Sequence, residues 1–243
     1  MDVAPTIAQV LRLDMNNVDG RPIPEIAGWG CKKVVLLIVD SLGYDLYMML
    51  EPYLPNFRSL ALNGLLYKAD CVSMHTTPAI ASILSGLYPE NHRVNETEDA
   101  YRSDFHSVLE LAQFMNIRSA VVMEEAGART FENKIEIIMG VPKRLSALKY
   151  DSEICARSLE AIDLLSEFLV AHFLGIDKIT HLGLGLDDLR VAAIAIDDHI
   201  GEIARATSHG TLIIVCGDHP VHSGELKNMN LSDTVALILT CSK

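Results

Sequence analysis

Apolar runs separated by polar turns recur along most of the chain, and their pattern predicts its secondary structure. Residues 32–40, KKVVLLIVD, contain a continuous apolar run rich in β-branched residues, which is typical of a strand buried on both faces. On the same grounds we expect further strands at residues 65–73, 117–124, 167–175, 210–218 and 233–241.

Segments with helical periodicity lie between these strands. Residues 103–116 are amphipathic, because their apolar side chains recur at the spacing of one helix face. We expect helices at residues 54–64, 78–87, 103–116, 151–166 and 186–207. Strands that alternate with helices pair mostly in parallel and carry helices on both faces. The pattern therefore predicts an α/β protein, a three-layer α/β/α sandwich with a mostly parallel central sheet.

The first 30 residues differ from the rest, since they hold the turn signals Asn16-Asn17, Asp19-Gly20, Pro22 and Pro24. We interpret residues 1–30 as an N-terminal extension and residues 31–243 as a single domain. Within that domain, residues 90–150 are the part of the chain that can form a small lid.

Composition and charge narrow the range of partners. Hydrophobic residues make up 49% of the 243 residues and charged residues 21%, which is a globular composition. Asp and Glu total 32 against 20 Lys and Arg, giving a formal net charge of −12. Such a chain repels polyphosphate backbones, so we expect no nucleic acid polymer as a partner. A phosphorylated substrate requires local cations, and bound metal ions supply them.

Cysteine usage and the absence of targeting signals favour a cytoplasmic protein. The five cysteines include no CxxC pair, so we interpret all of them as reduced thiols, mostly buried: Cys31, Cys71, Cys155, Cys216 and Cys241. Residues 1–14 lack the basic start and apolar run of a signal peptide. The apolar run at residues 34–39 is too short to span a bilayer, so we expect no membrane contact. The sequence does not indicate an oligomeric state.

Acids follow three of the apolar strands. Asp40 and Asp218 end their strands directly, and Asp177 follows a third. Ligands of parallel α/β sheets bind outside the carboxyl ends of the strands, so these acids are expected at one edge. Three histidines come shortly after two of the acids: His181, His219 and His222.

Aspartate and histidine are ligands of Zn²⁺ and Mn²⁺. Divided by proximity in the chain, the candidates form two sets of three. One set is Asp177, His181 and His222, and the other is Asp40, Asp218 and His219. Two metal ions about 4 Å apart make a site for phosphoryl chemistry. Taken singly, however, an acid at a strand end more often caps the next helix, and a lone histidine is more often structural.

The stretch HTTPAIASILSGLYPENHRV, residues 75–94, places two threonines before a proline at a helix start. Thr76 taken alone is most often an N-cap ahead of Pro78. A threonine hydroxyl becomes a nucleophile when a metal ion lowers its pKa. The nearby acids and histidines therefore make Thr76 a candidate nucleophile, with Thr77 as its structural neighbour.

Four segments together resemble the alkaline phosphatase superfamily of metallohydrolases, and most closely its nucleotide pyrophosphatase/phosphodiesterase branch. They are VVLLIVDSLGYDL, TTPAIASILSGLYPENHRV, GIDKITHLGLG and IVCGDHPVHSG, which follow the order of the family over residues 34–224. The resemblance implies an alkaline-phosphatase-like catalytic domain with a minimal cap.

The resemblance also implies roles for individual residues. Thr76 would be the nucleophile and a ligand of the metal ion held by Asp40, Asp218 and His219. The second metal ion would be held by Asp177, His181 and His222. Asn95 would correspond to the oxyanion-binding asparagine of the family, although it follows His92 at a shorter spacing. The implied cofactors are two divalent metal ions, Zn²⁺ first and Mn²⁺ as the alternative.

The implied function is a metal-dependent hydrolase of phosphoric esters, either a phosphodiesterase/pyrophosphatase or a phosphatase, acting on a small phosphorylated substrate. One alternative is a phosphoryl-transferring mutase of the same superfamily, although those enzymes use serine and carry a large second domain. Another is a degenerate, non-catalytic member that binds a ligand. That reading rests on Pro220, which stands where the family usually has glycine.

Overall fold

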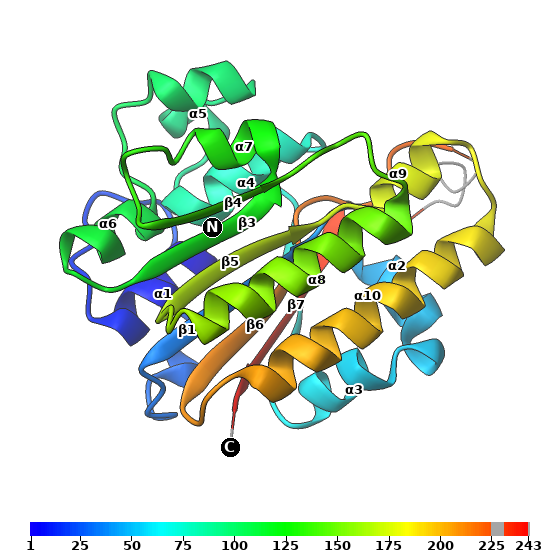
Figure 1. Ribbon diagram of the computed structural model, residues 1–243, viewed down its shortest axis with the longest axis horizontal. Helices are drawn as coiled ribbons and strands as arrows, with labels where there is room; N and C mark the ends of the chain where they lie inside the picture. Colours follow the sequence, from blue (N-terminus) through cyan, green and yellow to red (C-terminus); the bar gives the residue numbers. More distant parts are fainter. Residues whose placement is uncertain (225–230, 243) are drawn as a thin grey trace.

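The computed structural model describes residues 1–224 and 231–242, which form one seven-stranded sheet between two layers of helices (Figure 1). The strand order is β2-β7-β6-β1-β5-β3-β4, and only β7 runs against the others. This confirms the expected α/β/α sandwich with a mostly parallel sheet. The strands are β1 (Lys33–Val39), β2 (Leu65–Asp70), β3 (Ser119–Glu124), β4 (Ile137–Val141), β5 (Phe168–Phe173), β6 (Thr211–Gly217) and β7 (Thr234–Cys241).

Helices cover both faces of the sheet. The helices are α1 (Val3–Leu11), α2 (Tyr44–Leu50), α3 (Pro55–Leu62), α4 (Thr76–Ser85), α5 (Pro89–His92), α6 (Val108–Phe114), α7 (Glu125–Arg129), α8 (Ala147–Asp163), α9 (Gly175–His181) and α10 (Leu186–Ala206). Short 3₁₀ turns add η1 (Pro24–Ile26), η2 (Glu51–Tyr53) and η3 (Thr97–Tyr101). In Figure 1, α3, α8 and α10 lie in front of the sheet, and α1 and α4 lie behind it.

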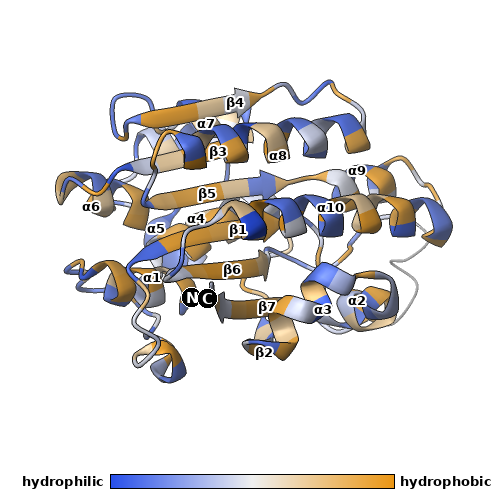
Figure 2. Cartoon of the chain, turned by 60° about the horizontal axis from the view of Figure 1, so that its bottom comes forward, coloured by the Kyte–Doolittle hydropathy of each residue, from blue (hydrophilic) through white to orange (hydrophobic). Residues whose placement is uncertain are grey.

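Each face of the sheet has its own apolar core, because side chains alternate along a strand. Leu37 of β1 packs in the core beneath α8 and α10, whereas Ile38 packs in the core that includes α1 and α4. Both side chains are fully buried, as expected for a strand covered on both faces. The apolar colouring of the central strands in Figure 2 follows from this double burial.

Register places the ends of the central strands side by side. Val39, the last residue of β1, pairs with Phe173 of β5 on one side and with Gly217 of β6 on the other. The residues that follow these three strand ends therefore meet at one edge of the sheet. This edge is where the candidate catalytic residues were expected.

Several elements differ from the sequence prediction. β4 was not expected, because its residues are only partly buried and lie at the sheet edge. The helix expected at 103–116 begins only at Val108, where Ser107 and Glu110 form a capping box. Residues 1–30 contain α1, whose apolar face is buried against the sheet. β3 and β4 fall inside residues 90–150, so a lid there is restricted to the rest of that range.

The expectation of five reduced cysteines is wrong for two of them. Cys31 and Cys241 form a disulfide, whereas Cys71, Cys155 and Cys216 are free. Because β7 runs opposite to β1, its last residue lies at the edge where β1 begins. The spacing of 210 residues between the two cysteines hides this proximity in the sequence. None of the helices in the described part of the chain has the length and apolar character needed to cross a membrane.

Candidate active site

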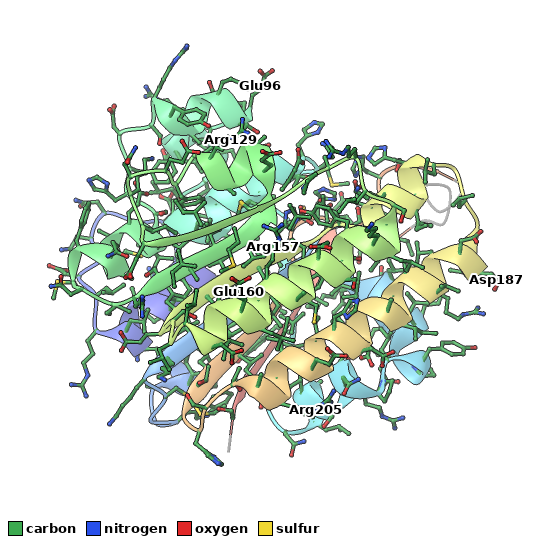
Figure 3. All side chains as sticks on the ribbon, viewed as in Figure 1. Glu96, Arg129, Arg157, Glu160, Asp187 and Arg205 are labelled. Atoms are coloured by element: carbon green, nitrogen blue, oxygen red, sulfur yellow. A yellow bond between two sulfur atoms is a disulfide. The ribbon has the colours of Figure 1, made fainter. Side chains whose placement is uncertain are left out.

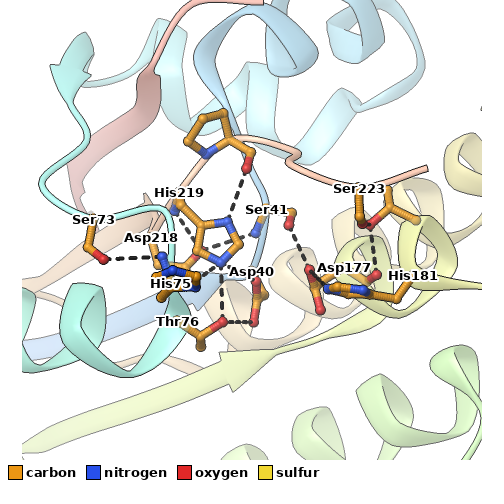
Figure 4. Close-up of polar contacts among 12 residues, drawn as sticks. Asp40, Ser41, Ser73, His75, Thr76, Asp177, His181, Asp218, His219 and Ser223 are labelled. Carbon is orange, nitrogen blue, oxygen red and sulfur yellow. Dashed lines mark hydrogen bonds and ion pairs between the residues drawn. The ribbon is translucent and has the colours of Figure 1, made fainter. Parts of the chain in front are cut away.

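Asp40 and Asp218 lie at the carboxyl ends of the adjacent strands β1 and β6 (Figure 4). Both are almost fully buried, with 1% and 3% of their surfaces exposed. Ser41 follows Asp40 in the left-handed region, with φ of 65°, an uncommon conformation for a residue other than glycine. In this conformation its backbone N–H donates to Asp218 Oδ1 (3.0 Å) and its hydroxyl donates to Asp177 Oδ1 (3.0 Å). Ser41 thus holds acids from two other strand ends.

Thr76 is the first residue of α4, and its side chain points into the site and not back to the helix. The N-cap residue is His75, and no side chain caps this end of the helix. The Thr76 hydroxyl lies 3.3 Å from Asp40 Oδ2 and 3.2 Å from His219 Nε2. Thr76 was considered either as a helix N-cap or as a candidate nucleophile. Its position fits a residue of the site and not an N-cap.

His219 is fully buried and faces both acids. Its Nε2 lies 3.2 Å from Asp40 Oδ1 and 3.4 Å from Asp218 Oδ2. Its Nδ1 lies 3.0 Å from the carbonyl oxygen of Pro220. A proton on Nδ1 donates to that carbonyl and leaves the Nε2 lone pair facing the site. Proline supplies this carbonyl as well as glycine does, so the departure at Pro220 preserves the contact.

The second expected ligand set is grouped around α9. Asp177 and His181 lie one turn apart on this helix, with 3.4 Å between Asp177 Oδ1 and His181 Nε2. The ring of His222 packs edge-on against both His181 and His219, with centroid distances of 5.2 Å and 4.8 Å. Ligand atoms of Asp177, His219 and His222 all lie within 4.8 Å of one another. His222 is therefore close to both sets, and His219 bridges them.

His172 was missed by the sequence analysis. It is a buried residue of β5, and its Nε2 lies 3.4 Å from Asp40 Oδ2. Ligand atoms of Asp40, His172 and Asp218 lie within 4.8 Å of one another. The signal in the sequence was one histidine inside the apolar run FLVAHFLG, one residue before the end of β5.

Asn95 is exposed in the segment between α5 and η3. Its backbone N–H donates to Asp99 Oδ2 at 2.9 Å, which helps to start the η3 turn. None of its hydrogen bonds within the described residues reaches Asp40, Thr76 or their neighbours. Its role as an oxyanion ligand therefore stays a prediction, and the hydrogen bonds of Asn95 do not support it.

Burial and mutual repulsion perturb the acids of the site. Desolvation raises the pKa of Asp218 well above its usual value, and the adjacent charge of Asp40 raises it further. The same two causes, burial first, raise the pKa of Asp177. Burial is also the main cause that lowers the pKa of His222. Charged carboxylates gathered at this depth need a positive group between them.

Four buried atoms of the site have no hydrogen-bond partner among the described residues: Asp40 Oδ1, Asp218 Oδ2, His172 Nε2 and His222 Nδ1. The two carboxylate oxygens lie near His219 Nε2 but outside hydrogen-bonding geometry. Buried polar atoms are normally paired, so this group of four is an exception that requires an explanation. Oxygen and imidazole nitrogen donors of this kind suit a divalent cation. The residues present therefore fit the metal ions that the superfamily resemblance implies.

A cavity of about 270 Å³ adjoins the site. Asp40, Thr76, Asp177 and His172 line it on the catalytic side. The remaining wall has an apolar part that includes Ile80, Leu84, Val94, Phe105, Met123 and Phe131, and a charged part that includes Glu110, Glu124, Lys134, Lys143 and Lys178. The hydroxyl of Thr76 thus stands between a group of acids and a cavity with both an apolar and a charged wall.

Comparison with known proteins places this geometry in a family context. Residues 34–100, from β1 into η3, match the family described as type I phosphodiesterase / nucleotide pyrophosphatase. No curated protein matches the sequence. Many solved structures share the fold, although their sequence identities are low.

Three of these structures illustrate the likeness. A protein of the alkaline phosphatase superfamily from Vibrio parahaemolyticus has a TM-score of 0.65 at 14% identity, over 88% of this chain and 60% of that one. Phosphonoacetate hydrolase from Sinorhizobium meliloti, in complex with phosphonoacetate, has a TM-score of 0.63 at 13% identity, over 86% of this chain and 60% of that one. A protein from Pyrococcus horikoshii has a TM-score of 0.61 at 16% identity, over 87% of this chain and 86% of that one.

The chain thus has the alkaline-phosphatase-like fold that the sequence resemblance implied. It spans 60% of the length of the phosphonoacetate hydrolase and of the Vibrio protein. At identities this low, the TM-scores establish a shared fold alone, and activity has to be argued from the site itself.

Proposed function

We propose that this protein is a metal-dependent hydrolase of phosphoric esters in which Thr76 is the nucleophile. The observation that carries the proposal is the position of the Thr76 hydroxyl, which makes no helix cap and lies 3.3 Å from Asp40 and 3.2 Å from His219. A threonine that only capped a helix would not need the buried acids and histidines that surround the Thr76 hydroxyl at this edge of the sheet.

Two divalent metal ions are part of the proposal, Zn²⁺ first and Mn²⁺ as the alternative. Asp40, Asp218 and His219 would hold one ion beside Thr76. The other would be held by the set of Asp177, His181 and His222. When bound, such ions offset the charge of the phosphoryl oxygens and favour the deprotonated form of a coordinated hydroxyl. Metal content measured on the purified protein tests this part, because a degenerate binding module would hold about none.

Thr76 also stands at a favourable place for binding a phosphoryl group. α4 has ten residues, and the backbone N–H groups of its first turn, together with the helix dipole, favour a negative charge at its N-terminus. Its Oγ1 donates to Asp40 Oδ2, which orients the oxygen toward the cavity. Oγ1 loses its proton to solvent and attacks phosphorus, a threonine phosphoester forms, and the bond to the leaving group breaks as that group takes up a proton from solvent. Water then cleaves the phosphoester, which restores the Thr76 hydroxyl and releases phosphate from a monoester substrate or a phosphomonoester from a diester substrate.

The adjoining cavity indicates where the leaving group would lie. Its apolar wall begins one turn along α4 from Thr76, at Ile80, and continues to Phe105 and Phe131. A leaving group with an apolar or aromatic face suits this wall. We therefore propose a small phosphorylated substrate, with an aryl ester as the first compound to assay. The cytoplasmic location expected from the sequence remains a prediction.

The test of the nucleophile compares Thr76→Ala with Thr77→Ala in the metal-loaded protein. Thr77 is the neighbouring threonine and lines the same cavity, so its variant controls for a general disturbance of the helix start. We expect Thr76→Ala to lose about 1,000-fold or more in kcat on p-nitrophenyl phosphate or bis-p-nitrophenyl phosphate. Thr77→Ala should retain most activity. Full activity of Thr76→Ala on both compounds would falsify the covalent route.

A further inference from the structure

A second group of metal-ligating side chains lies outside the candidate active site, between α8 and α10. These two helices pack side by side on one face of the sheet, as Figure 3 shows. Cys155 comes from α8, and His199 and Glu202 come from α10. One ligand atom from each of the three residues lies within 4.8 Å of the other two. The three residues have no part in the proposed hydrolysis.

The distance between two of the ligand atoms is that of a metal site. Cys155 Sγ lies 3.6 Å from Glu202 Oε2. Sulfur and oxygen ligands bound at about 2.3 Å and about 2.1 Å to a tetrahedral ion lie about 3.6 Å apart. The thiol and the carboxylate therefore already have the separation that one shared ion requires. No movement of either helix is needed to bring them together.

The imidazole of His199 is held in place and is available to bind a cation. Its ring is nearly parallel to that of Phe173, with an interplanar angle of 13° and a centroid distance of 6.5 Å. Its Nδ1 is buried and has no hydrogen-bond partner in residues 1–224 and 231–242. A buried nitrogen without a partner is uncommon and costs free energy. Engagement of this imidazole by a cation costs no existing hydrogen bond.

The charges around the group favour a cation. Asp198 and Glu202 are exposed acids on α10 beside His199. Burial lowers the pKa of His199, so its imidazole is neutral at neutral pH and can act as a ligand. Burial and the charge of Glu202 raise the pKa of the Cys155 thiol to about 12. The free protein therefore carries the protonated thiol, which donates to Glu202.

We propose that Cys155, His199 and Glu202 bind one divalent cation of the Zn²⁺ class and that this ion joins α8 to α10. On binding, the S–H bond of Cys155 breaks, a bond from Sγ to the metal forms, and the proton passes to solvent. Because Glu202 is at the surface, water occupies the fourth position. The mixed sulfur, nitrogen and oxygen donors favour Zn²⁺ and Co²⁺ over Mg²⁺ and Ca²⁺.

Titration of the full chain with Co²⁺ tests the proposal, because a thiolate ligand gives a sulfur-to-cobalt charge-transfer band in the near ultraviolet. The proposed catalytic ligands contain no cysteine, so the band indicates a site that includes a thiolate. We expect about three equivalents of bound Co²⁺ and the band in the wild type, against about two equivalents and no band in Cys155→Ser. Cys71→Ala is the control, since Cys71 Sγ lies 3.7 Å from the carbonyl oxygen of Asp218. The proposal fails if the wild type gives no band, or if Cys155→Ser keeps it.

A matched pair of surface variants separates ligation from charge and avoids any change to the core. Glu202→Gln removes the proposed ligand oxygen, whereas Asp198→Asn removes an equal charge from the same exposed side of α10. We expect Glu202→Gln to weaken Co²⁺ binding at the thiolate site by more than about 100-fold, since even changes beyond the ligands cost about 10- to 100-fold. Asp198→Asn should change it only slightly. Equal effects of the two variants mean that general charge attracts the ion, which overturns the ligand role of Glu202.

Discussion

The hydroxyl of Ser41 donates a 3.0 Å hydrogen bond to Asp177, a residue 136 positions later in the chain. The amide of the same serine donates to Asp218, so one residue fixes acids from both proposed metal sites. Its left-handed backbone, with φ of 65°, is what lets both groups point into the site. Strained backbone at such a position is a common property of functional sites.

Ser41→Ala should weaken metal binding at the set of Asp177, His181 and His222. The variant removes only the hydroxyl that orients Asp177, and changes of this kind cost about 10- to 100-fold in metal affinity. Isothermal titration with Zn²⁺ measures the loss. Ser41→Gly is the control, because it also lacks the hydroxyl but relieves the strain. If Ser41→Gly binds metal like the wild type, the hydroxyl is not needed at this position, which contradicts the prediction.

His172→Gln tests the histidine that the sequence analysis missed. Because its Nε2 is buried 3.4 Å from Asp40 and has no partner among the described residues, we expect it to support the metal ion beside Thr76. The variant should lower Zn²⁺ affinity about 10- to 100-fold and leave the fold intact, as judged by circular dichroism. His209→Gln, at an exposed position, is the control. Unchanged Zn²⁺ affinity in His172→Gln means that His172 has only a packing role.

Gly175→Ala should destabilise the protein. A methyl group at Gly175 would collide with Asp151 Oδ2, a buried oxygen on α8. Overpacking of this kind costs about 1–3 kcal/mol, which a urea unfolding curve resolves. Gly28→Ala is the control, because a methyl group there meets no atom within 4 Å. Equal stability of Gly175→Ala and the wild type would show that α8 and α9 separate easily at this contact.

Asp151 should make stability depend on pH. Burial raises its pKa to about 7, so the folded state binds a proton that the unfolded state releases near 3.8. The resulting stabilisation is fully present below pH 3.8 and is lost as the pH rises through about 7. Its upper limit is about 4 kcal/mol, from three pKa units at about 1.4 kcal/mol each.

The measurement is the free energy of unfolding of the metal-free protein at several pH values, for the wild type and Asp151→Asn. Asparagine keeps the oxygen that accepts from the N–H groups of Leu174 and Gly175. The variant should lose the part of the decrease between about pH 4 and pH 7 that Asp151 contributes, and keep the part that comes from Asp218 and Asp177, whose pKa values are also raised. An identical slope in both proteins would show that Asp151 does not titrate in this range.

The sequence pattern predicted the central strands well, because β1 and β6 are buried on both faces and their composition reflects that burial alone. It also predicted where Asp40 and Asp218 lie, since both residues directly follow such strands. β4 was not predicted, because its apolar run of Ile137, Ile138 and Met139 is only three residues long before Gly140 interrupts it. α9 was not predicted either, because its seven residues are too few for a helical period to show.

The missed site residues depend on pairing between distant strands. His172 is a single polar residue in an apolar run, and it gains meaning only because β5 pairs with β1, which places it opposite Ile38 and near Asp40. Ser41 acts through a backbone conformation that its residue type does not favour. The suggested role of Asn95 came from resemblance alone, and its observed hydrogen bond to Asp99 is a local one.

The position of β7 has a consequence for the order of folding. Within the described residues β2 pairs only with β7, so the strand that leads into Thr76 stays unpaired during synthesis until residues 234–241 have left the ribosome. Contacts of such long sequence separation form late and slowly. The proposed nucleophile, Thr76, would therefore reach its final position only after β7 has been made, which keeps a shorter nascent chain from displaying a working hydroxyl.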